Sequence, residues 1–307
     1  MKSRILTLIA SLSAVAASSA AEPVADAKDL PRIAPLEPPE ALASFQIKKG
    51  FRVELAAAEP NVASPVAMAF DENGRLFVIE MRDYPERRKE RLGTVRMLED
   101  TDGDGRFDRS TIYAKDLPWP TTVICYHGGV FVGAVPDILW LKDTNGDGVA
   151  DERKVVFTGF SPGENPELAP RVFNGFKWGL DNRIHGATAG HGGTVKSLAD
   201  SQPEPLNLRG RDFSFDPRTL TMRAESGTAQ FGLSFDQHGR KFVCSNSRHI
   251  QTLMYEDRYA QRNPLFVMPA ALVDIAVDGP AAEIFRISPD EPWRIIRTRW
   301  RLSLIHI

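Results

Sequence analysis

Two nine-residue segments hold the side chains of this sequence that are best suited to binding a metal ion. They read DTDGDGRFD over residues 100–108 and DTNGDGVAD over residues 143–151. In both, oxygen-bearing side chains alternate around a glycine turn, which is an arrangement that can surround Ca²⁺. The ligands expected in the first segment are Asp100, Asp102, Asp104, the backbone carbonyl of Arg106, and Asp108. Those expected in the second segment are Asp143, Asn145, Asp147, the backbone carbonyl of Val149, and Asp151.

Neither segment is an EF-hand, because that motif needs a bidentate Glu at position 12 and a helix on each side. Position 12 is Thr111 in the first segment and Lys154 in the second, and the flanking residues alternate as strands do. The alternative is a turn held by hydrogen bonds from Asp and Asn side chains to the backbone, without metal. The second segment has one carboxylate fewer and is the weaker calcium candidate. The two segments start 43 residues apart, the length of one propeller blade.

Composition limits the classes of protein that this chain can belong to. Its 307 residues can form one large all-β domain or two smaller ones. A net charge of −2 predicts no general attraction to nucleic acid or to anionic lipid. Lys2 and Arg4 precede an apolar run over residues 5–17, and small residues follow as far as position 21. This pattern predicts a signal peptide over residues 1–21 and an exported protein, periplasmic or secreted, with no transmembrane segment.

The chain has two cysteines, Cys125 and Cys244, each in a strand-like run. In an exported protein they can form one disulfide, or they can be buried separately as small apolar side chains. There is no Cys-x-x-Cys-His haem attachment site in the sequence.

The spacing of strands and turns predicts an all-β fold of the β-propeller type. Residues 22–45 contain five prolines and read as an extended linker, and residues 51–56 alternate as a strand. Hairpins are expected over residues 66–79, 128–141, 177–185 and 232–244, the first and last sharing Phe-Asp-x-x-Gly-Arg-x-Phe-Val. We therefore expect about four blades over residues 46–301, with a fifth beginning near residues 283–287. A β-sandwich is the competing architecture, but it does not explain a repeat of hairpin and acidic loop.

The end of the chain does not close such a ring. Residues 293–301 still read as a strand, yet residues 302–307 contain no turn and no closing strand. Because exposed blade edges invite aggregation, a propeller needs its ring closed. We expect a fragment of a six-bladed propeller, with a truncated or non-native tail over residues 302–307.

An ordered series of motifs resembles the propeller of the PVC-type membrane-bound dehydrogenase family. The motifs are residues 50–60, 64–71, 80–85, 128–132, 174–186 and 286–294, and the resemblance runs from about residue 45 to 301. Members of that family often continue into a C-type haem domain, which would accept electrons. The resemblance therefore implies a propeller whose haem partner lies outside this sequence.

The same region is distantly similar to the soluble quinoprotein glucose and sorbosone dehydrogenases. That resemblance implies pyrroloquinoline quinone and Ca²⁺ at the mouth of a six-bladed propeller, with a His that deprotonates a sugar hydroxyl. The His belongs to a His-Asn-Gly-Gly motif, but the comparable stretch here is Arg171-Val-Phe-Asn174-Gly175. His185 and His191, in the glycine-rich segment that follows, are the alternative catalytic candidates. The competing interpretation is that His185 only fills a hairpin position, half buried against a neighbour.

A second group of polar residues flanks the last hairpin. It consists of Gln230, Asn246 and Arg248 as candidate cofactor ligands and His249 as a further catalytic candidate. If every blade points the same end at the axis, these residues could meet Arg82 and Asp83 of the first blade. Converging Arg, Asn, Gln and His side chains suit an anionic or polyhydroxylated ligand. The competing interpretation is an ordinary turn at Asn246, with Arg248 in solvent.

Two functions from different classes are therefore open. The first is an exported dehydrogenase-like propeller that oxidises a sugar or polyol with a quinone cofactor and passes electrons to a haem domain. The second is a noncatalytic propeller module, stabilised by calcium, that binds a glycan or a protein. Fold alone does not decide between them.

Overall fold

The structure is a computed structural model. It describes residues 28, 30, 34–84, 87–160, 172–199, 202–260, 262–263, 265–277, 279–280 and 291–303. The chain divides into two units, one formed by residues 37–283 and the other by residues 1–36 together with 284–307. All of the described strands belong to the first unit, so the propeller lies there.

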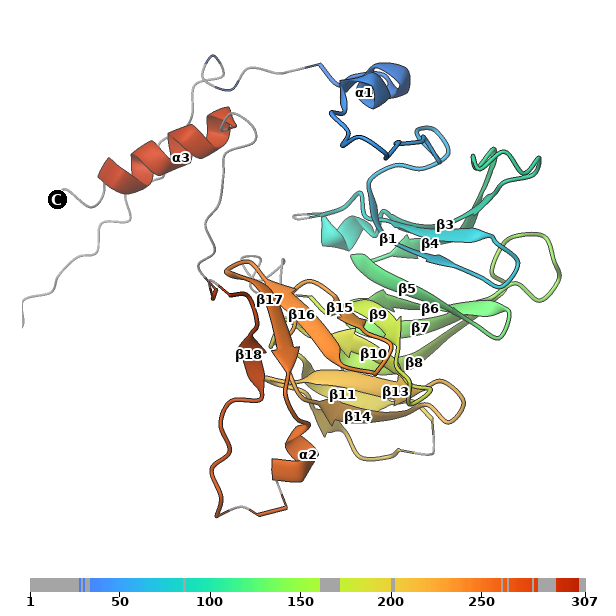
Figure 1. The fold of residues 1–307 in the computed structure, drawn as a ribbon. Coiled ribbons are helices and arrows are strands. Elements are labelled where there is room, and N and C mark those ends of the chain that lie inside the picture. Colours follow the sequence, from blue (N-terminus) through green and yellow to red (C-terminus); the bar gives the residue numbers. More distant parts are fainter. Residues whose placement is uncertain are drawn as a thin grey trace, which may run out of the picture. The chain divides into compact units, whose positions relative to one another are not determined.

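The first two blades are antiparallel sheets whose strands follow one another in chain order (Figure 1). Blade 1 contains β1 (Pro65–Phe70), β2 (Leu76–Glu80), β3 (Gly93–Glu99) and β4 (Arg109–Leu117). A short 3-10 helix, η2 (Arg88–Glu90), lies between β2 and β3. Blade 2 contains β5 (Pro120–Tyr126), β6 (Gly129–Ala134), β7 (Asp137–Lys142) and β8 (Glu152–Phe160).

Blades 3 and 4 also have four strands each, and this part of the chain adds a short helix and two further strands. Blade 3 contains β9 (Asn174–Trp178), β10 (Ile184–Ala187), β13 (Asp212–Asp216) and β14 (Thr221–Glu225). Blade 4 contains β15 (Leu233–Phe235), β16 (Lys241–Ser245), β17 (Arg248–Leu253) and β18 (Leu272–Asp274), with α2 (Asp257–Ala260) between the last two strands. Two further strands, β11 (Gly193–Ser197) and β12 (Leu206–Asn207), leave blade 3 after β10 and extend the sheet of blade 2 beyond β8.

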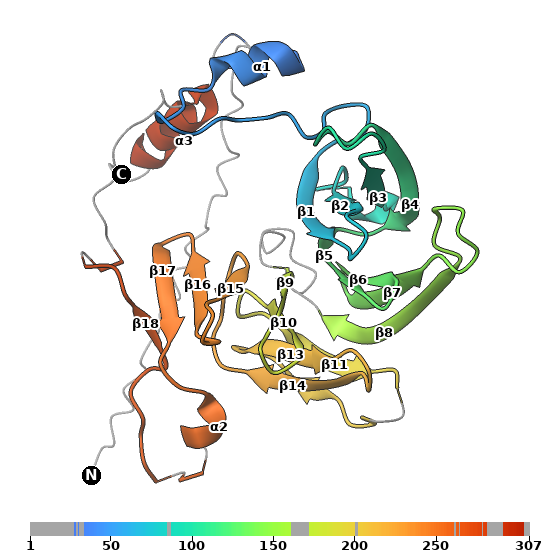
Figure 2. The ribbon, with the colours of Figure 1, turned by 45° about the vertical axis from the view of Figure 1, so that its right-hand side comes forward.

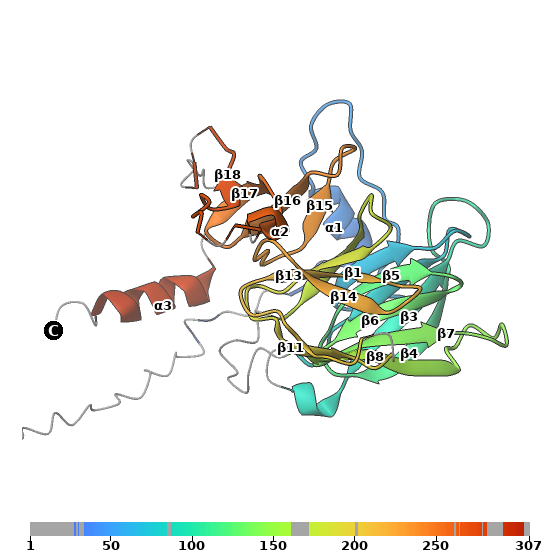
Figure 3. The same ribbon diagram turned by 90° about the horizontal axis from the view of Figure 1, so that it is seen from below.

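The sequence prediction of about four blades is confirmed within the described residues, and all four expected hairpins form. The first strand of each blade contacts the first strand of the next, as β1 with β5, β5 with β9, and β9 with β15. Figure 2 shows the four sheets succeeding one another around these first strands, and Figure 3 shows β1 beside β5. This arrangement of four-stranded meanders defines a β-propeller.

The repeated hairpin motif folds in the same way in blades 1 and 4. The carboxylate of Asp71 accepts hydrogen bonds from the backbone N–H of Asn73 at 3.0 Å and of Arg75 at 2.8 Å. Its other oxygen accepts from the guanidinium Nε of Arg75 at 2.7 Å. Asp236 and Arg240 reproduce these bonds in blade 4. The shared Asp and Arg therefore stabilise the turn that begins each blade.

Phenylalanine side chains hold neighbouring blades together. Between blades 2 and 3 the rings of Phe131 and Phe215 lie 5.2 Å apart, and those of Phe160 and Phe213 lie 4.9 Å apart. All four side chains are buried. Full burial of a Phe side chain contributes about 1.5–3 kcal/mol, so this interface is a main source of stability.

Two regions predicted as strands do not form them. Residues 51–56 are without regular structure, because their only described tie to a blade is the single bond from the N–H of Phe107 to the carbonyl of Ala56 at 2.8 Å. Residues 293–301 lie in a helix, α3 (Pro292–Ser303), in the unit separate from the propeller. The same run of Arg, Ile and Trp is also compatible with a helical period. The start of a fifth blade at residues 283–287 lies outside the described residues.

The N-terminal linker contains one helix, α1 (Pro38–Ser44), with Pro at its start and no buried side chain. The rest of residues 34–45 is irregular, as an extended linker predicts, and the signal peptide region lies outside the described residues. Within the described residues no helix is long and apolar enough to cross a membrane.

The two cysteines lie on different blades, Cys125 on β5 and Cys244 on β16, and both are free thiols. Of the two alternatives, separate packing is therefore the one observed. Burial raises the pKa of the Cys125 thiol to about 12, which keeps it protonated and unreactive at neutral pH.

Candidate functional site

Strand direction gives each blade two functionally different ends. The first strands start at a common end, because the hydroxyl of Thr121, on β5, donates to the carbonyl of Phe173 at 2.6 Å. The amide of Asn174, on β9, donates in turn to the carbonyl of Gln230 at 2.9 Å. We call this the funnel end. The opposite end carries the turns between first and second strands and the loops between third and fourth strands, and we call it the turn end.

A pocket of about 680 Å³ lies at the funnel end, along β1, β5 and β9. Its walls are mostly apolar, and polar groups come from Tyr84, Thr121, Asn174 and Lys177. The remaining lining residues are Val66, Ala67, Met68, Met81, Thr122, Val123, Val172, Gly175, Phe176, Phe231 and Gly232. A mainly apolar hollow with a few polar groups is the usual character of a small-molecule site.

Two glycines permit the close approach of blades 3 and 4 beside this pocket. Gly175 has a φ of +69°, and a Cβ there would lie 2.5 Å from the Cα of Gly232. The side chain of Asn174 completes the contact, because its oxygen accepts from the N–H of Gly232 at 2.6 Å. Asn174 therefore holds the wall of the pocket through its amide and is not available as a free ligand-binding group.

Several predicted site residues do lie at the funnel end. The N–H of Asn246 donates to the side-chain oxygen of Gln230 at 3.1 Å, so these two residues meet as expected. His191 follows β10 at the same end of blade 3. Arg248 forms an ion pair with Asp274 on β18, and His249 is exposed on β17. None of these residues is among those that line the described part of the pocket.

Arg82 and Asp83 do not join that group, since the side chain of Arg82 is bound within blade 1 and that of Asp83 is buried. Arg82 donates to the carboxylate of Glu80 at 2.8 Å, and the hydroxyl of Thr94 donates to the same oxygen at 2.6 Å. Burial would raise the pKa of Glu80, but these bonds and Arg96 hold it below its usual range. Asp83 is buried, and burial raises its pKa. Its oxygens make no hydrogen bond of normal geometry to a described residue.

His185 lies at the turn end, away from the funnel pocket, because it stands near the start of β10 just after the hairpin turn. Its Nε2 is 3.0 Å from Oδ1 of Asp181, and its ring packs on Phe235 with centroids 5.0 Å apart. The ring of His185 is therefore packed against a neighbour, as one of the two interpretations expects. A second pocket, of about 390 Å³, opens beside His185 between blades 3 and 4.

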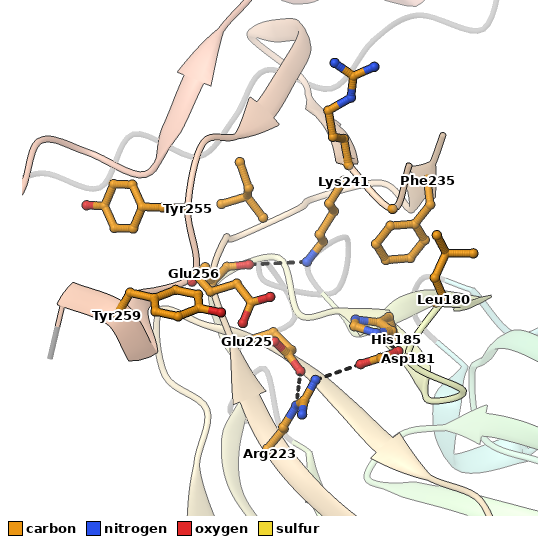
Figure 4. Close-up of a pocket in the computed structure, with 15 residues that line it drawn as sticks. Leu180, Asp181, His185, Arg223, Glu225, Phe235, Lys241, Tyr255, Glu256 and Tyr259 are labelled. Atoms are coloured by element: carbon orange, nitrogen blue, oxygen red, sulfur yellow. Dashed lines mark hydrogen bonds and ion pairs between the residues drawn. The ribbon is translucent and has the colours of Figure 1, made fainter. Parts of the chain in front are cut away.

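Sequence reasoning missed the charged residues of this second pocket. The guanidinium of Arg223 donates to Oδ2 of Asp181 at 2.7 Å and to Oε1 of Glu225 at 2.6 Å (Figure 4). Phe235 and Leu180 form one wall, and Tyr255 and Tyr259 form the other. The alternation of Arg223 and Glu225 along a strand was the available signal, since it places both on one face.

The two acidic segments connect the third and fourth strands of blades 1 and 2, as the strand-like residues on their flanks predict. They lie at the turn end and are remote from the funnel pocket. Each segment also has a contact with an earlier part of the chain. In the second segment, the N–H of Asp143 donates to the hydroxyl of Tyr113 at 3.0 Å. The corresponding contact of the first segment is the bond from the N–H of Phe107 to Ala56.

Within each segment the side chains are already ordered around the turn. Asp100 accepts from the N–H groups of Gly103 at 2.7 Å and Gly105 at 2.9 Å, and Asp143 does the same in the second segment. The carboxylates of Asp100, Asp102 and Asp104 lie close enough together to hold one ion. Asp108 instead accepts two bonds from Thr101, which lowers its pKa, and Asp151 is bound in the same way by Thr144. The carboxylate at position 9 of each segment therefore closes the loop by binding the threonine at position 2 of the same segment.

The fold is that of a β-propeller, with a mostly apolar pocket at the end where its first strands start. The chain belongs to the family described as domain of unknown function DUF7133, whose profile matches residues 37–304. No curated protein matches the sequence.

Solved structures with a similar fold include two quinone-dependent sugar dehydrogenases. One is the holo form of the pyranose dehydrogenase PQQ domain from Coprinopsis cinerea, with 13% identity, a TM-score of 0.43, and coverage of 68% of this chain and 47% of that one. Another is the PQQ-bound aldose sugar dehydrogenase from Streptomyces coelicolor, with 17% identity, a TM-score of 0.42, and coverage of 66% and 61%.

A third similar structure is the β-propeller domain of Cps50 (Swd1) from Myceliophteria thermophila, with 13% identity, a TM-score of 0.38, and coverage of 70% and 60%. The chain thus spans about half to three fifths of the length of these three structures. At such low similarity no residue of theirs is matched to a residue of this chain.

Proposed function

We propose that this chain is the substrate-binding propeller of an exported, dehydrogenase-like oxidoreductase that acts on a sugar or another polyol. The observation that carries the proposal is the funnel pocket of about 680 Å³, which offers aromatic, methionine and aliphatic walls beside an ammonium and hydroxyl groups. A sugar presents apolar C–H faces and a rim of hydroxyls, so it needs both kinds of surface. The resemblance of the sequence motifs to a dehydrogenase family supports the same class of substrate.

The described lining of the funnel pocket does not by itself fit pyrroloquinoline quinone. That cofactor carries several carboxylates and is held with Ca²⁺, so it needs several cationic groups and an oxygen-rich metal site. Lys177 is the only cationic side chain among the described lining residues, and no carboxylate is among them. Residues 161–171 lie outside the described residues. We therefore derive no oxidation step from the pocket, and electron transfer to a haem domain stays part of the proposal.

Calcium has a structural role in this proposal. The acidic segments at residues 100–108 and 143–151 sit at the turn end, where an ion would fix the outer strands of blades 1 and 2. A cation there would be too far from the funnel pocket to act on its ligand.

One observation favours a second candidate function, a noncatalytic propeller that binds a glycan or a protein. Proton transfer from a sugar hydroxyl needs a base within hydrogen-bond reach. No histidine or carboxylate is found among the described residues that line the funnel pocket. Both candidates use the same pocket, so they differ in redox chemistry and not in location.

The first experiment tests ligand binding. The chain is titrated with a panel of aldoses and sugar alcohols by calorimetry, as wild type and as the Lys177→Ala and Tyr84→Ala variants. Both variants are expected to weaken binding about tenfold or more, since each loses a polar contact worth about 1–2 kcal/mol. Lys115→Ala, which removes an exposed lysine on β4, is the matched control. Equal affinity in all four proteins would remove the funnel pocket from the proposal.

The second experiment separates the two candidates. The protein is incubated with pyrroloquinoline quinone and Ca²⁺, and sugar-dependent reduction of a dye acceptor is followed. Dye reduction that requires both additions supports the oxidoreductase. Sugar binding without quinone binding or dye reduction would identify the noncatalytic module instead.

A further inference from the structure

The pocket between blades 3 and 4 at the turn end has a chemistry that the proposed function does not use. Its floor carries an imidazole and two carboxylates, from His185, Asp181 and Glu225. His185 and Glu225 are almost fully buried, whereas Asp181 is partly exposed. His185 lies on β10, Glu225 on β14 and Asp181 in the turn between β9 and β10, all in blade 3 and all among the described residues.

The three groups are close enough together to share one ion. Each offers a ligand atom, and these atoms lie within 4.8 Å of one another. The 3.0 Å between Nε2 of His185 and Oδ1 of Asp181 is a hydrogen-bond distance, and widening it to about 3.3 Å gives the separation of two ligand atoms on a tetrahedral ion. We propose that Asp181, His185 and Glu225 bind one divalent transition-metal ion of the Zn²⁺ type.

Arg223 orients the two carboxylates for this role. It donates to Oδ2 of Asp181 and to Oε1 of Glu225, and the hydroxyl of Ser214 also donates to Oε1 of Glu225 at 2.5 Å. The second oxygen of Glu225 is left as a ligand atom, and Oδ1 of Asp181, which accepts only a 3.2 Å bond from the N–H of Arg183 besides its contact with His185, has a lone pair facing the same space. Fixing the outer oxygens of ligating carboxylates is what residues behind a metal site do.

The charge of the group also favours a cation. The carboxylates of Asp181, Glu225 and Glu256 and the guanidinium groups of Arg223 and Arg183 leave one net negative charge around the imidazole. Lys241, at the edge of the pocket, is already paired with Asp212, and Arg240 is paired with Asp236. Lys241 and Arg240 therefore add little positive charge to the pocket. A divalent ion would offset the net negative charge that remains.

The imidazole can present its Nε2 to a metal. In this structure Nε2 donates its proton to the carboxylate of Asp181, which can only accept a hydrogen bond. Nδ1 is buried and has no hydrogen-bond partner among the described residues. An ion that takes the lone pair of Nε2 therefore displaces this proton to Nδ1 or to solvent. Phe235 holds the ring in place, and the absence of a side chain at Gly179 is required, since a Cβ there would lie 2.6 Å from Nε2.

One imidazole and two carboxylates distinguish this site from the calcium segments. Zn²⁺ and Co²⁺ accept mixed nitrogen and oxygen ligands, whereas Ca²⁺ takes oxygen ligands. Three protein ligands leave at least one coordination position, and the pocket of about 390 Å³ gives a small ligand access to it. Such a site could polarise a bound water or carbonyl, which distinguishes it from a closed structural zinc site.

The test uses Co²⁺ as a visible probe on the full chain, after chelation and with excess Ca²⁺ present to fill the acidic segments. We expect one equivalent of Co²⁺ to produce absorption bands of low-symmetry coordination, and Zn²⁺ to displace it. His185→Gln and Glu225→Gln should weaken Co²⁺ binding at least tenfold. His249→Gln and Asp102→Asn are the matched controls, and both should retain the wild-type spectrum.

A second measurement does not rely on the folding of a variant. X-ray absorption of the Co²⁺-loaded wild type should show one imidazole nitrogen together with oxygen ligands. A folded wild type that binds no Co²⁺, or a bound ion with oxygen ligands only, would show that Asp181, His185 and Glu225 form a metal-free ion network. An unchanged spectrum in folded His185→Gln would overturn the assignment equally.

Discussion

The ammonium of Lys241 donates a hydrogen bond to the carboxylate of Asp212 at 2.7 Å and so joins blade 4 to blade 3. Both side chains are nearly inaccessible to solvent. Asp212 also accepts from the N–H of Thr188 at 3.1 Å, and Lys241 donates to the carbonyl of Ser226 at 3.3 Å. A buried charge is costly unless it is paired and hydrogen-bonded, and here both conditions are met.

Breaking this pair is expected to destabilise the propeller strongly. In Lys241→Met the Asp212 carboxylate stays buried without its counter-ion, so we expect a loss of about 3–5 kcal/mol in the free energy of unfolding. Arg240→Met, next in sequence but in an exposed pair with Asp236, should cost at most about 1 kcal/mol. Denaturant unfolding of the three proteins measures the difference. Similar stabilities for the two variants would mean that the inter-blade pair is not a main support.

Chelation of Ca²⁺ is expected to lower the melting temperature, because an ion bound only by the folded state stabilises it. At a concentration of about 100 times Kd the stabilisation is about 2.7 kcal/mol. The effect should shrink in Asp100→Asn and Asp104→Asn, which each remove a charged ligand. Glu99→Gln, which alters the neighbouring exposed pair with Arg109, should keep it. Identical melting curves with and without chelator would remove calcium from the acidic segments.

The turn between β13 and β14 should contribute stability that depends on acid pH. The side-chain bonds from Arg218 hold the pKa of Asp216 at about 2, below its ordinary value of 3.8. A carboxyl whose pKa is lower in the folded state stabilises the fold above pH 3.8, and this stability disappears as the pH falls towards 2. Wild type should therefore exceed Asp216→Asn by about 1 kcal/mol at pH 6, and the gap should close by about pH 2. A gap that does not change with pH would contradict the assigned pairing.

Gly175→Ala should deform the wall of the funnel pocket. The residue has a φ of +69°, and the new Cβ would lie 2.5 Å from the Cα of Gly232, so the backbone must shift. We expect a loss of about 1–3 kcal/mol together with weaker ligand binding. Gly210→Ala is the control, because its φ is +72° and nothing lies within 4 Å of its Cβ position. Calorimetry measures ligand binding and denaturant unfolding measures stability. Because Gly210→Ala introduces strain without a clash, equal effects of the two substitutions would show that the contact with Gly232 is unimportant.

Local sequence patterns were sufficient for the hairpins and for the number of blades. The Asp71 and Asp236 turns form from residues at most four positions apart, so the chain itself specifies them. The acidic segments are local for the same reason, and their position between third and fourth strands follows from their place after each hairpin. The same patterns could not place β11 and β12, which leave blade 3 to pair with β8, because that pairing depends on a distant edge.

The same distinction between local patterns and distant pairing holds for the candidate site residues. Gln230 and Asn246 were expected together and are together, since both flank one hairpin. Arg82 and Asp83 were expected beside them but serve blade 1, because the buried Glu80 and Trp119 lie closer to them. His185 was considered for the funnel, but the direction of β10 places it at the other end.

The sequence by itself determined the repeated turns, the acidic loops and the all-β propeller, because each rests on bonds or alternation within a few residues. Only the tertiary structure decided which side chains share a pocket. Asp181, His185, Arg223 and Glu225 come together because β10, the turn before it and β14 belong to one sheet, although as many as 44 positions separate them. Such a grouping depends on the direction and pairing of whole strands, and no short segment of sequence contains that information.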